Sequence, residues 1–153
     1  MKKIGVIGSG IVAKTLGNGF LKHGYEVMLS SRDEAKLDEW KEKGGKHAHV
    51  GSFEDAAKFG SIVVLAVKGD KAAEAIEAAG PQNLLRKTVI DTTNPIAAGA
   101  PEDGVLKFFT NLDESLMERL QTQFPEVHFV KSFNCVGNAY MVDPSFGEKP
   151  TMF

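Results

Sequence analysis

Two glycines near the N-terminus have the spacing of a phosphate-binding turn. They belong to the segment Gly8-Ser9-Gly10-Ile11-Val12-Ala13, a G-x-G-x-x-A pattern that follows an apolar run over residues 4–7 and precedes an amphipathic segment. Gly8 would form a sharp strand-to-helix turn, Gly10 would let the backbone approach a pyrophosphate, and Ala13 would allow the helix to pack closely on the strand. The phosphates would lie at the helix N-terminus, where unpaired N–H groups favour anions. The pattern predicts a dinucleotide-binding turn, although a plain tight turn gives the same letters.

The residues after the next apolar run, 25–30, indicate which dinucleotide is bound. About 20 positions after the glycines, where NAD-binding chains carry an acidic residue, this chain has Ser30-Ser31-Arg32. A carboxylate would repel a 2′-phosphate, whereas a serine hydroxyl and a guanidinium can hydrogen-bond to it. We therefore predict that NADP(H) is preferred over NAD(H). The alternative is that Ser31 only caps a helix and that Arg32 is a solvated residue of its first turn.

Composition and charge limit the class of protein. With 153 residues, 42% of them hydrophobic, the chain is long enough for one domain with a sizeable core. A net charge of −2 provides no basic surface, so neither nucleic acid nor a membrane is an expected partner. Cys135 is the only cysteine, and His47 and His49 have no third clustered ligand, so we predict no disulfide and no metal site. No signal peptide pattern is present, and we expect a cytoplasmic protein.

Hydrophobic patterning predicts strands alternating with helices. The candidate strands are short apolar or β-branched runs at residues 4–7, 25–30, 47–50, 62–67, 88–91 and 127–133. The candidate helices have apolar residues at helical spacing over 12–23, 31–44, 52–60, 72–79 and 112–124. Ser31 and Glu34 have capping-box spacing, which predicts Ser31 as the N-cap of the second helix. Residues 92–105 show no clear period, so we expect a long loop there of the kind that often carries function.

This alternation indicates a parallel sheet with right-handed crossovers. Because the dinucleotide pattern follows the first strand, we predict an α/β, doubly wound (Rossmann) sheet with the strand order 3-2-1-4-5-6. Ligands then bind at the carboxyl ends of the strands, at the switch point between the first and fourth strands. The candidate cofactor-binding residues at these ends are Gly8, Ser9, Gly10, Ile11, Val12, Ser30, Ser31, Arg32, Val67, Lys68, Thr93, Asn94, Pro95 and Asn134.

Four segments, taken in order, resemble the NADP-binding domain of the deazaflavin-dependent NADP oxidoreductases, also called NADPH:coenzyme F-420 reductases. They are KKIGVIGSGIVAKTLGNGFLKHGYEV at the N-terminus, SSRD after the second strand, IDTTNP at the fifth and KSFNCVGNAYMVDP at the sixth. The first segment is shared by many dehydrogenases, whereas the SR, TNP and K-x-F-N combination in that order is considerably more specific. The resemblance spans essentially the whole chain.

The resemblance implies hydride transfer between carbon 4 of a nicotinamide and a planar acceptor, a deazaflavin or flavin-like molecule. This step needs no protein nucleophile or base, so we predict no catalytic residue; the protein orients the reactants and excludes water. By position, the nicotinamide would be bordered by Thr93, Asn94 and Pro95, with Lys68 at the rim and Phe133-Asn134 as the far wall. Without a ligand, Asn94-Pro95 is an ordinary turn signal and Lys68 a solvated side chain.

Members of this family continue, past a segment like residues 147–153, into a further strand and a smaller C-terminal portion that helps form the deazaflavin site and the dimer. We therefore expect residues 1–153 to be a single Rossmann domain, truncated at its C-terminal end, and the full-length protein to form a homodimer. Two alternatives stay open. One is a reductase of the same fold with a ferric, quinone or imine acceptor, and the other is a non-catalytic module that binds and senses NADP(H).

Overall fold

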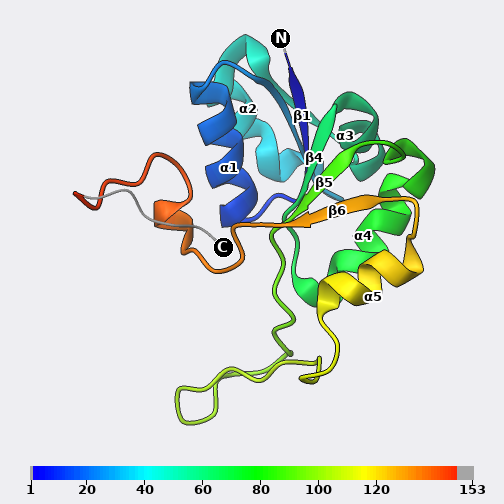
Figure 1. Ribbon diagram of the computed structural model, residues 1–153. Helices are drawn as coiled ribbons and strands as arrows, with labels where there is room; N and C mark the ends of the chain where they lie inside the picture. The colour runs from blue at the N-terminus through cyan, green and yellow to red at the C-terminus, as the bar shows by residue number, and fades with distance from the viewer. Residues whose placement is uncertain (1, 148–153) are drawn as a thin grey trace.

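The computed structural model describes residues 2–147 and is built on a six-stranded, fully parallel β-sheet (Figure 1). The strands are β1 (Lys3–Ile7), β2 (Glu26–Ser30), β3 (Ala48–Gly51), β4 (Ile62–Leu65), β5 (Thr88–Asp91) and β6 (His128–Lys131). They lie in the order β3-β2-β1-β4-β5-β6. The chain thus runs outward from β1 to β3, returns to β4 beside β1, and runs outward again to β6. The predicted doubly wound order is confirmed.

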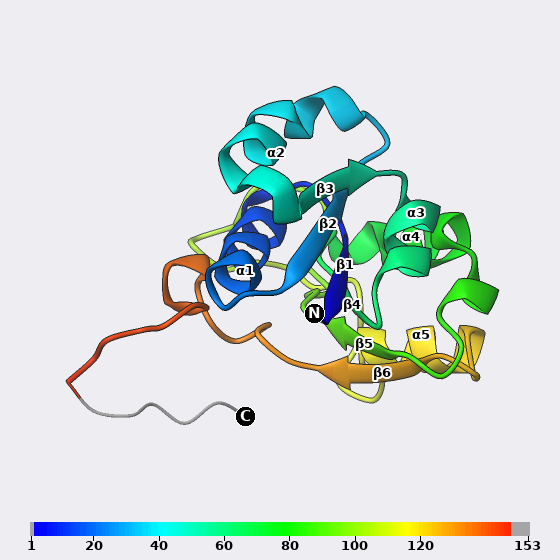
Figure 2. The same ribbon diagram turned by 90° about the horizontal axis from the view of Figure 1, so that it is seen from above.

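Helices cover both faces of the sheet, as a parallel sheet requires. On one face lie α1 (Ile11–Lys22) and α2 (Asp38–Gly44), and on the other lie α3 (Phe53–Phe59), α4 (Ala72–Ala79) and α5 (Leu116–Gln123) (Figure 2). Side chains alternate between the two faces along each strand. In β4, Val63 and Leu65 therefore join the core beneath α3, α4 and α5, whereas Val64 joins the core beneath α1 and α2. Burial on both faces explains why the central strands are continuous apolar runs.

None of the helices within residues 2–147 has the length and apolar character that crossing a membrane would require.

The second helical segment begins differently from its prediction. Ser31 is not a helix N-cap: a 3-10 helix over Glu34–Leu37 comes first, with Asp33 as its N-cap, and α2 follows it. The Ser31 hydroxyl oxygen instead accepts a hydrogen bond from the backbone N–H of Asp33 at 3.2 Å, which closes a local turn. The capping-box prediction was wrong because this short-range turn satisfies the hydroxyl before the helix begins. Complete capping boxes start α3, at Ser52 and Asp55, and α5.

Three predicted boundaries also shift. The fourth strand ends at Leu65 rather than 67, and the sixth ends at Lys131 rather than 133. Phe133 has a left-handed φ of +64°, which is incompatible with an extended strand. The last helix begins at Leu116, so Leu112 does not belong to it and lies fully exposed in the preceding loop.

The segment between β5 and α5 forms a projecting arm, which we define as residues 95–109. Its two sides pair with each other, since the Ala97 N–H donates to the Lys107 carbonyl at 2.8 Å and the Phe109 N–H donates to the Pro95 carbonyl at 2.9 Å. The arm extends away from the sheet and its helices (Figure 1). The predicted loop over residues 92–105 is therefore part of a longer segment that is ordered by its own hydrogen bonds.

After β6 the chain returns to α1, and a strap over residues 137–143 packs against that helix. A Cβ added to Gly19 would lie 2.5 Å from Cγ2 of Val142, so α1 and the strap approach closely. Asp143 receives a hydrogen bond from Lys22 Nζ at 2.7 Å and lies 2.9 Å from His23 Nε2. These hydrogen bonds, first from Lys22 and then from His23, hold the pKa of Asp143 below its ordinary value. The strap is thus tied to the last turn of α1 by charge as well as by packing.

Candidate functional site

The loop between β1 and α1 forms the floor of the candidate site. Gly8 has a φ of +140°, and a Cβ on it would lie 2.2 Å from the carbonyl oxygen of Ala66, so a side chain does not fit there. Gly10, the N-cap of α1, has an ordinary φ of −76°, and a Cβ on it would meet no atom within 4 Å. The fold therefore requires glycine at Gly8 but not at Gly10. Because no side chain caps α1, the unpaired N–H groups of its first turn are available to a ligand.

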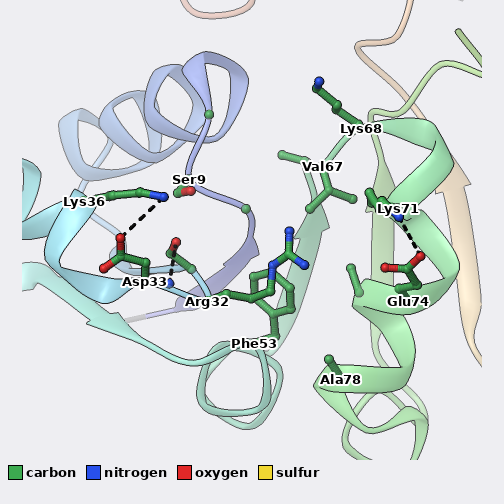
Figure 3. Close-up of a pocket in the computed structure, with 15 residues that line it drawn as sticks. Ser9, Arg32, Asp33, Lys36, Phe53, Val67, Lys68, Lys71, Glu74 and Ala78 are labelled. Atoms are coloured by element: carbon green, nitrogen blue, oxygen red, sulfur yellow. Dashed lines mark hydrogen bonds and ion pairs between the residues drawn. The ribbon is translucent and has the colours of Figure 1, made fainter. Parts of the chain in front are cut away.

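A cavity of about 500 Å³, here named the β2-side cavity, lies between the loops after β1 and β2 and the beginning of α4. Arg32 and Phe53 point into this space, and Lys71 and Glu74 face it from the α4 side (Figure 3). Its lining consists of Gly8, Ser9, Gly10, Ser31, Arg32, Asp33, Lys36, Phe53, Ala66, Val67, Lys68, Lys71, Glu74, Ala75 and Ala78. This volume is within the ordinary range for small-molecule sites.

Charged side chains surround the β2-side cavity, and two of its cations are already paired. Lys36 lies 3.4 Å from Asp33, and Lys71 lies 2.8 Å from Glu74. The hydrogen bond that Lys71 donates to Glu74 raises the pKa of Lys71, and the nearby positive charge of Arg32 acts in the opposite direction. Within residues 2–147, Arg32 itself forms no ion pair. Its guanidinium is therefore available to an incoming anion, as is the ammonium group of Lys68.

A second cavity of about 510 Å³, the β5-side cavity, adjoins the first. The two cavities share Gly10, Ala66, Val67 and Lys68, so they meet at the end of β4, beside the first turn of α1. The rest of its lining comes from Ile11, Val12, Gly69, Asp70, Thr92, Thr93, Asn94, Ile96, Ala97, Ala98 and Gly99. Together the cavities occupy the carboxyl ends of β1, β2, β4 and β5, which is where the switch point of a doubly wound sheet places a ligand.

Comparison with known proteins identifies the family. The family model described as "NADP oxidoreductase coenzyme F420-dependent" matches residues 3–95. The chain belongs to this family. Among solved structures, a candidate F420-dependent NADP reductase from Arthrobacter sp. FB24 is 33% identical with a TM-score of 0.83, and the match covers 94% of this chain and 67% of that one. A comparison with curated proteins finds no match.

Two further solved structures are similar to this chain in fold. A hypothetical protein from Sinorhizobium meliloti is 24% identical with a TM-score of 0.77, over 96% of this chain and 69% of that one. An imine reductase from Myxococcus stipitatus, in complex with NADP+, is 21% identical with a TM-score of 0.60, over 86% of this chain and 40% of that one. At these identities the similarity supports the fold alone.

All but three of the predicted cofactor-binding residues line one of the two cavities. Ser30 does not: it is fully buried, and its hydroxyl donates to the Val6 carbonyl at 2.8 Å, which joins β2 to β1. Pro95 lies in the arm, where its carbonyl accepts a hydrogen bond from the opposite side. Asn134 also lies outside the lining, and its carbonyl accepts a hydrogen bond from Asn94 Nδ2 at 2.8 Å. These three residues support the cavity walls and do not form them.

Several lining residues were not among the predicted site residues, including Asp33, Lys36, Phe53, Lys71, Glu74 and the arm residues 97–99. Lys36 could have been found, because the predicted helix over 31–44 would place it four residues after Arg32 on the same face; in the structure it pairs with Asp33. Phe53 comes from α3, and Lys71 precedes α4. No sequence spacing relates either of them to Arg32, so only the fold brings them to one cavity.

No cluster of three or more His, Cys, Asp or Glu side chains within residues 2–147 is arranged to hold a metal ion.

Proposed function

We propose that this chain binds NADP(H) along the two cavities, with the adenosine 2′-phosphate in the β2-side cavity and the nicotinamide in the β5-side cavity. The observation that carries the proposal is the unpaired guanidinium of Arg32, which lines the cavity at the end of β2. An acidic residue there would repel a 2′-phosphate, whereas a guanidinium donates to it in a planar, bidentate geometry. The hydroxyl of Ser31 accepts from Asp33, which leaves its own proton available to a phosphate oxygen.

The floor of the site fits the pyrophosphate of such a dinucleotide. A Cβ on Gly10 would project into open space rather than against protein atoms, so the missing side chain lets a ligand approach the backbone. The N-terminus of α1 offers unpaired N–H groups and the positive end of a 12-residue helix dipole. Lys68, which is exposed and lines both cavities, adds a positive charge where the two cavities meet.

The chemistry of bound NADPH is the donation of a hydride from its nicotinamide. The residues of this chain then have to orient the nicotinamide and exclude water, and no side chain has to act as an acid or a base. In the β5-side cavity, Thr93 and Asn94 are held by internal hydrogen bonds, and Ile96 and Ala97 of the arm add apolar lining. Such a rigid wall with few ionisable groups suits a step whose main requirement is orientation.

We propose a deazaflavin or flavin-like molecule as the hydride acceptor, and a second copy of the chain as a partner in the full-length protein. The family description, which names coenzyme F420, and the Arthrobacter relative at 33% identity support the acceptor class. The test offers the intact protein NADPH with a deazaflavin, a flavin, a ferric chelate, a quinone or an imine. NADPH oxidation with the deazaflavin or the flavin, and with none of the other acceptors, is the expected result. NADPH binding without oxidation by any acceptor would favour a sensing module instead.

The phosphate site is tested by titration calorimetry of the Arg32→Ala variant with NADPH and with NADH. A charge-assisted hydrogen bond is worth about 1.5–3 kcal/mol, so the NADPH affinity should fall by about tenfold or more. The NADH affinity should stay nearly unchanged because NADH has no 2′-phosphate. Arg86→Ala is the matched control, since it removes the same charge from the loop before β5, at the amino end of that strand and away from the carboxyl ends where the cavities lie. Equal losses for both nucleotides would contradict the proposed position of the phosphate.

A further inference from the structure

A partly buried ion pair joins the ends of β5 and β6 beside the β5-side cavity. Asp91 and Lys131 are register partners at the last position of each strand. Asp91 is fully buried, and Lys131 Nζ lies 2.9 Å from its Oδ2. Neither residue lines the β2-side or the β5-side cavity. The proposed binding of NADP(H) makes no direct use of this pair.

Both members of the pair hold the same neighbouring residue, Thr93. Oδ1 of Asp91 accepts hydrogen bonds from the Thr93 backbone N–H at 2.9 Å and from the Thr93 hydroxyl at 2.7 Å. Lys131 Nζ donates a further hydrogen bond to the Thr93 carbonyl oxygen. The amide, hydroxyl and carbonyl of Thr93, a residue of the cavity lining, are therefore all hydrogen-bonded to this one ion pair.

The next residue, Asn94, is held from two other directions. Its Nδ2 donates to the Asn134 carbonyl at 2.8 Å, which ties it to the segment after β6. On the other side, a Cβ added to Gly69 would lie 2.1 Å from the Asn94 carbonyl oxygen, so the loop after β4 presses against it. Residues 93 and 94 are thus fixed at the edge of the β5-side cavity before any ligand arrives.

Because Asp91 is fully buried, the desolvation of its charge offsets much of its attraction to the partly exposed Lys131, so the pair contributes little to stability on its own. An apolar pair of similar volume could join the two strands equally well. Apolar side chains could not hold the amide, hydroxyl and carbonyl of Thr93 in one arrangement. The hydrogen bonds of Asp91 and Lys131 therefore position the turn at Thr93, which apolar core side chains could not do.

We infer that Asp91 and Lys131 are positioning residues for the nicotinamide half of the dinucleotide. They act through Thr93, whose backbone and side chain they keep in a binding-competent arrangement in the β5-side cavity, next to Asn94. The β2-side cavity, where the adenosine 2′-phosphate is proposed to bind, contains none of these four residues. The two halves of the ligand therefore depend on different parts of the fold. This inference rests on the proposed function.

The test compares two ligands by titration calorimetry: NADPH, which spans both cavities, and adenosine 2′,5′-bisphosphate, which can occupy only the β2-side cavity. Asp91→Asn keeps a carbonyl oxygen for Thr93 but removes the anion that Lys131 pairs with. For this variant we expect the NADPH affinity to fall by about tenfold or more, the value of one charge-assisted hydrogen bond. Binding of the bisphosphate should change by less than about twofold, within the usual additivity of distant sites.

The double variant Asp91→Asn/Lys131→Met controls for the unpaired Lys131 charge that Asp91→Asn alone would leave, because it removes both charges. It should show the same selective loss of NADPH. Parallel losses of both ligands, unchanged NADPH binding, or failure of both variants to fold would assign the pair to stability and overturn the inference. Failure of the wild-type chain to bind either ligand would instead refute the proposed function, and the inference with it. The two failures are therefore distinguishable.

Discussion

Replacing Gly10 with alanine should separate the folding role of the β1–α1 loop from its binding role. The added Cβ meets no protein atom within 4 Å, and the φ of −76° suits any residue. The remaining cost is the weaker N-cap preference of alanine, so the free energy of unfolding should fall by no more than about 1 kcal/mol. The methyl group would, however, occupy the space through which a pyrophosphate approaches the first turn of α1. Loss of one or two charge-assisted hydrogen bonds should weaken NADPH binding by about tenfold to several hundredfold.

Gly8→Ala is the matched control, two residues away in the same loop. Its Cβ would lie 2.2 Å from the Ala66 carbonyl oxygen, at a φ of +140°. Backbone strain and overpacking together should lower the free energy of unfolding by about 3 kcal/mol or more. Urea unfolding and NADPH titration are measured on both variants. If Gly10→Ala binds NADPH as tightly as the wild type, or is destabilised as strongly as Gly8→Ala, the assignment of Gly10 to ligand approach is refuted.

Two further predictions concern parts of the chain outside the cavities. Pairing with Lys22 and His23 lowers the pKa of Asp143 in the folded protein. The pairing therefore stabilises the fold fully at pH values above the ordinary aspartate pKa of about 4. This contribution is lost as the pH falls through the lowered pKa. The difference in thermal stability between wild type and Asp143→Asn should therefore be present at pH 5 and shrink at more acidic pH; an unchanged difference at pH 3 would contradict this sign. Leu120→Ala should lower the free energy of unfolding by about 2–5 kcal/mol, since that side chain is 1% exposed. The fully exposed Leu112→Ala should change it by less than about 0.5 kcal/mol, and a comparable loss at both positions would refute the observed start of α5.

The sequence predicted the architecture well because the signals for it are local. Continuous apolar runs mark strands that are buried on both faces, as for Ile62–Leu65, and the glycine pattern after the first strand indicates the doubly wound order. Local signals failed where two local interactions compete. Ser31 has the spacing of a helix cap, yet its hydroxyl bonds to Asp33 instead. Leu112 has helical spacing with Leu116, yet the capping box of Ser115 and Glu118 starts the helix after it.

In the candidate site, too, local sequence signals predicted some features and not others. The positions of Gly8, Gly10 and Arg32 could be predicted because motif spacing places each one at the carboxyl end of a strand. Spacing could not show that Gly8 is required by the fold while Gly10 is not, since this depends on where Ala66 lies. It also could not show that Ser30 faces the interior rather than a ligand, because that is decided by the carbonyl of Val6 on the neighbouring strand.

By itself, then, the sequence determined the order of the strands, the glycine turn after β1, the guanidinium at the end of β2 and the resemblance to F420-dependent NADP oxidoreductases. Tertiary structure decided which distant side chains act together. Asp91 and Lys131 belong to separate motifs 40 residues apart, and they meet only because β5 and β6 are neighbours in register. The physical reason is that local propensity depends on adjacent residues, whereas the pairing of charges far apart in the sequence depends on which strands the completed sheet brings side by side.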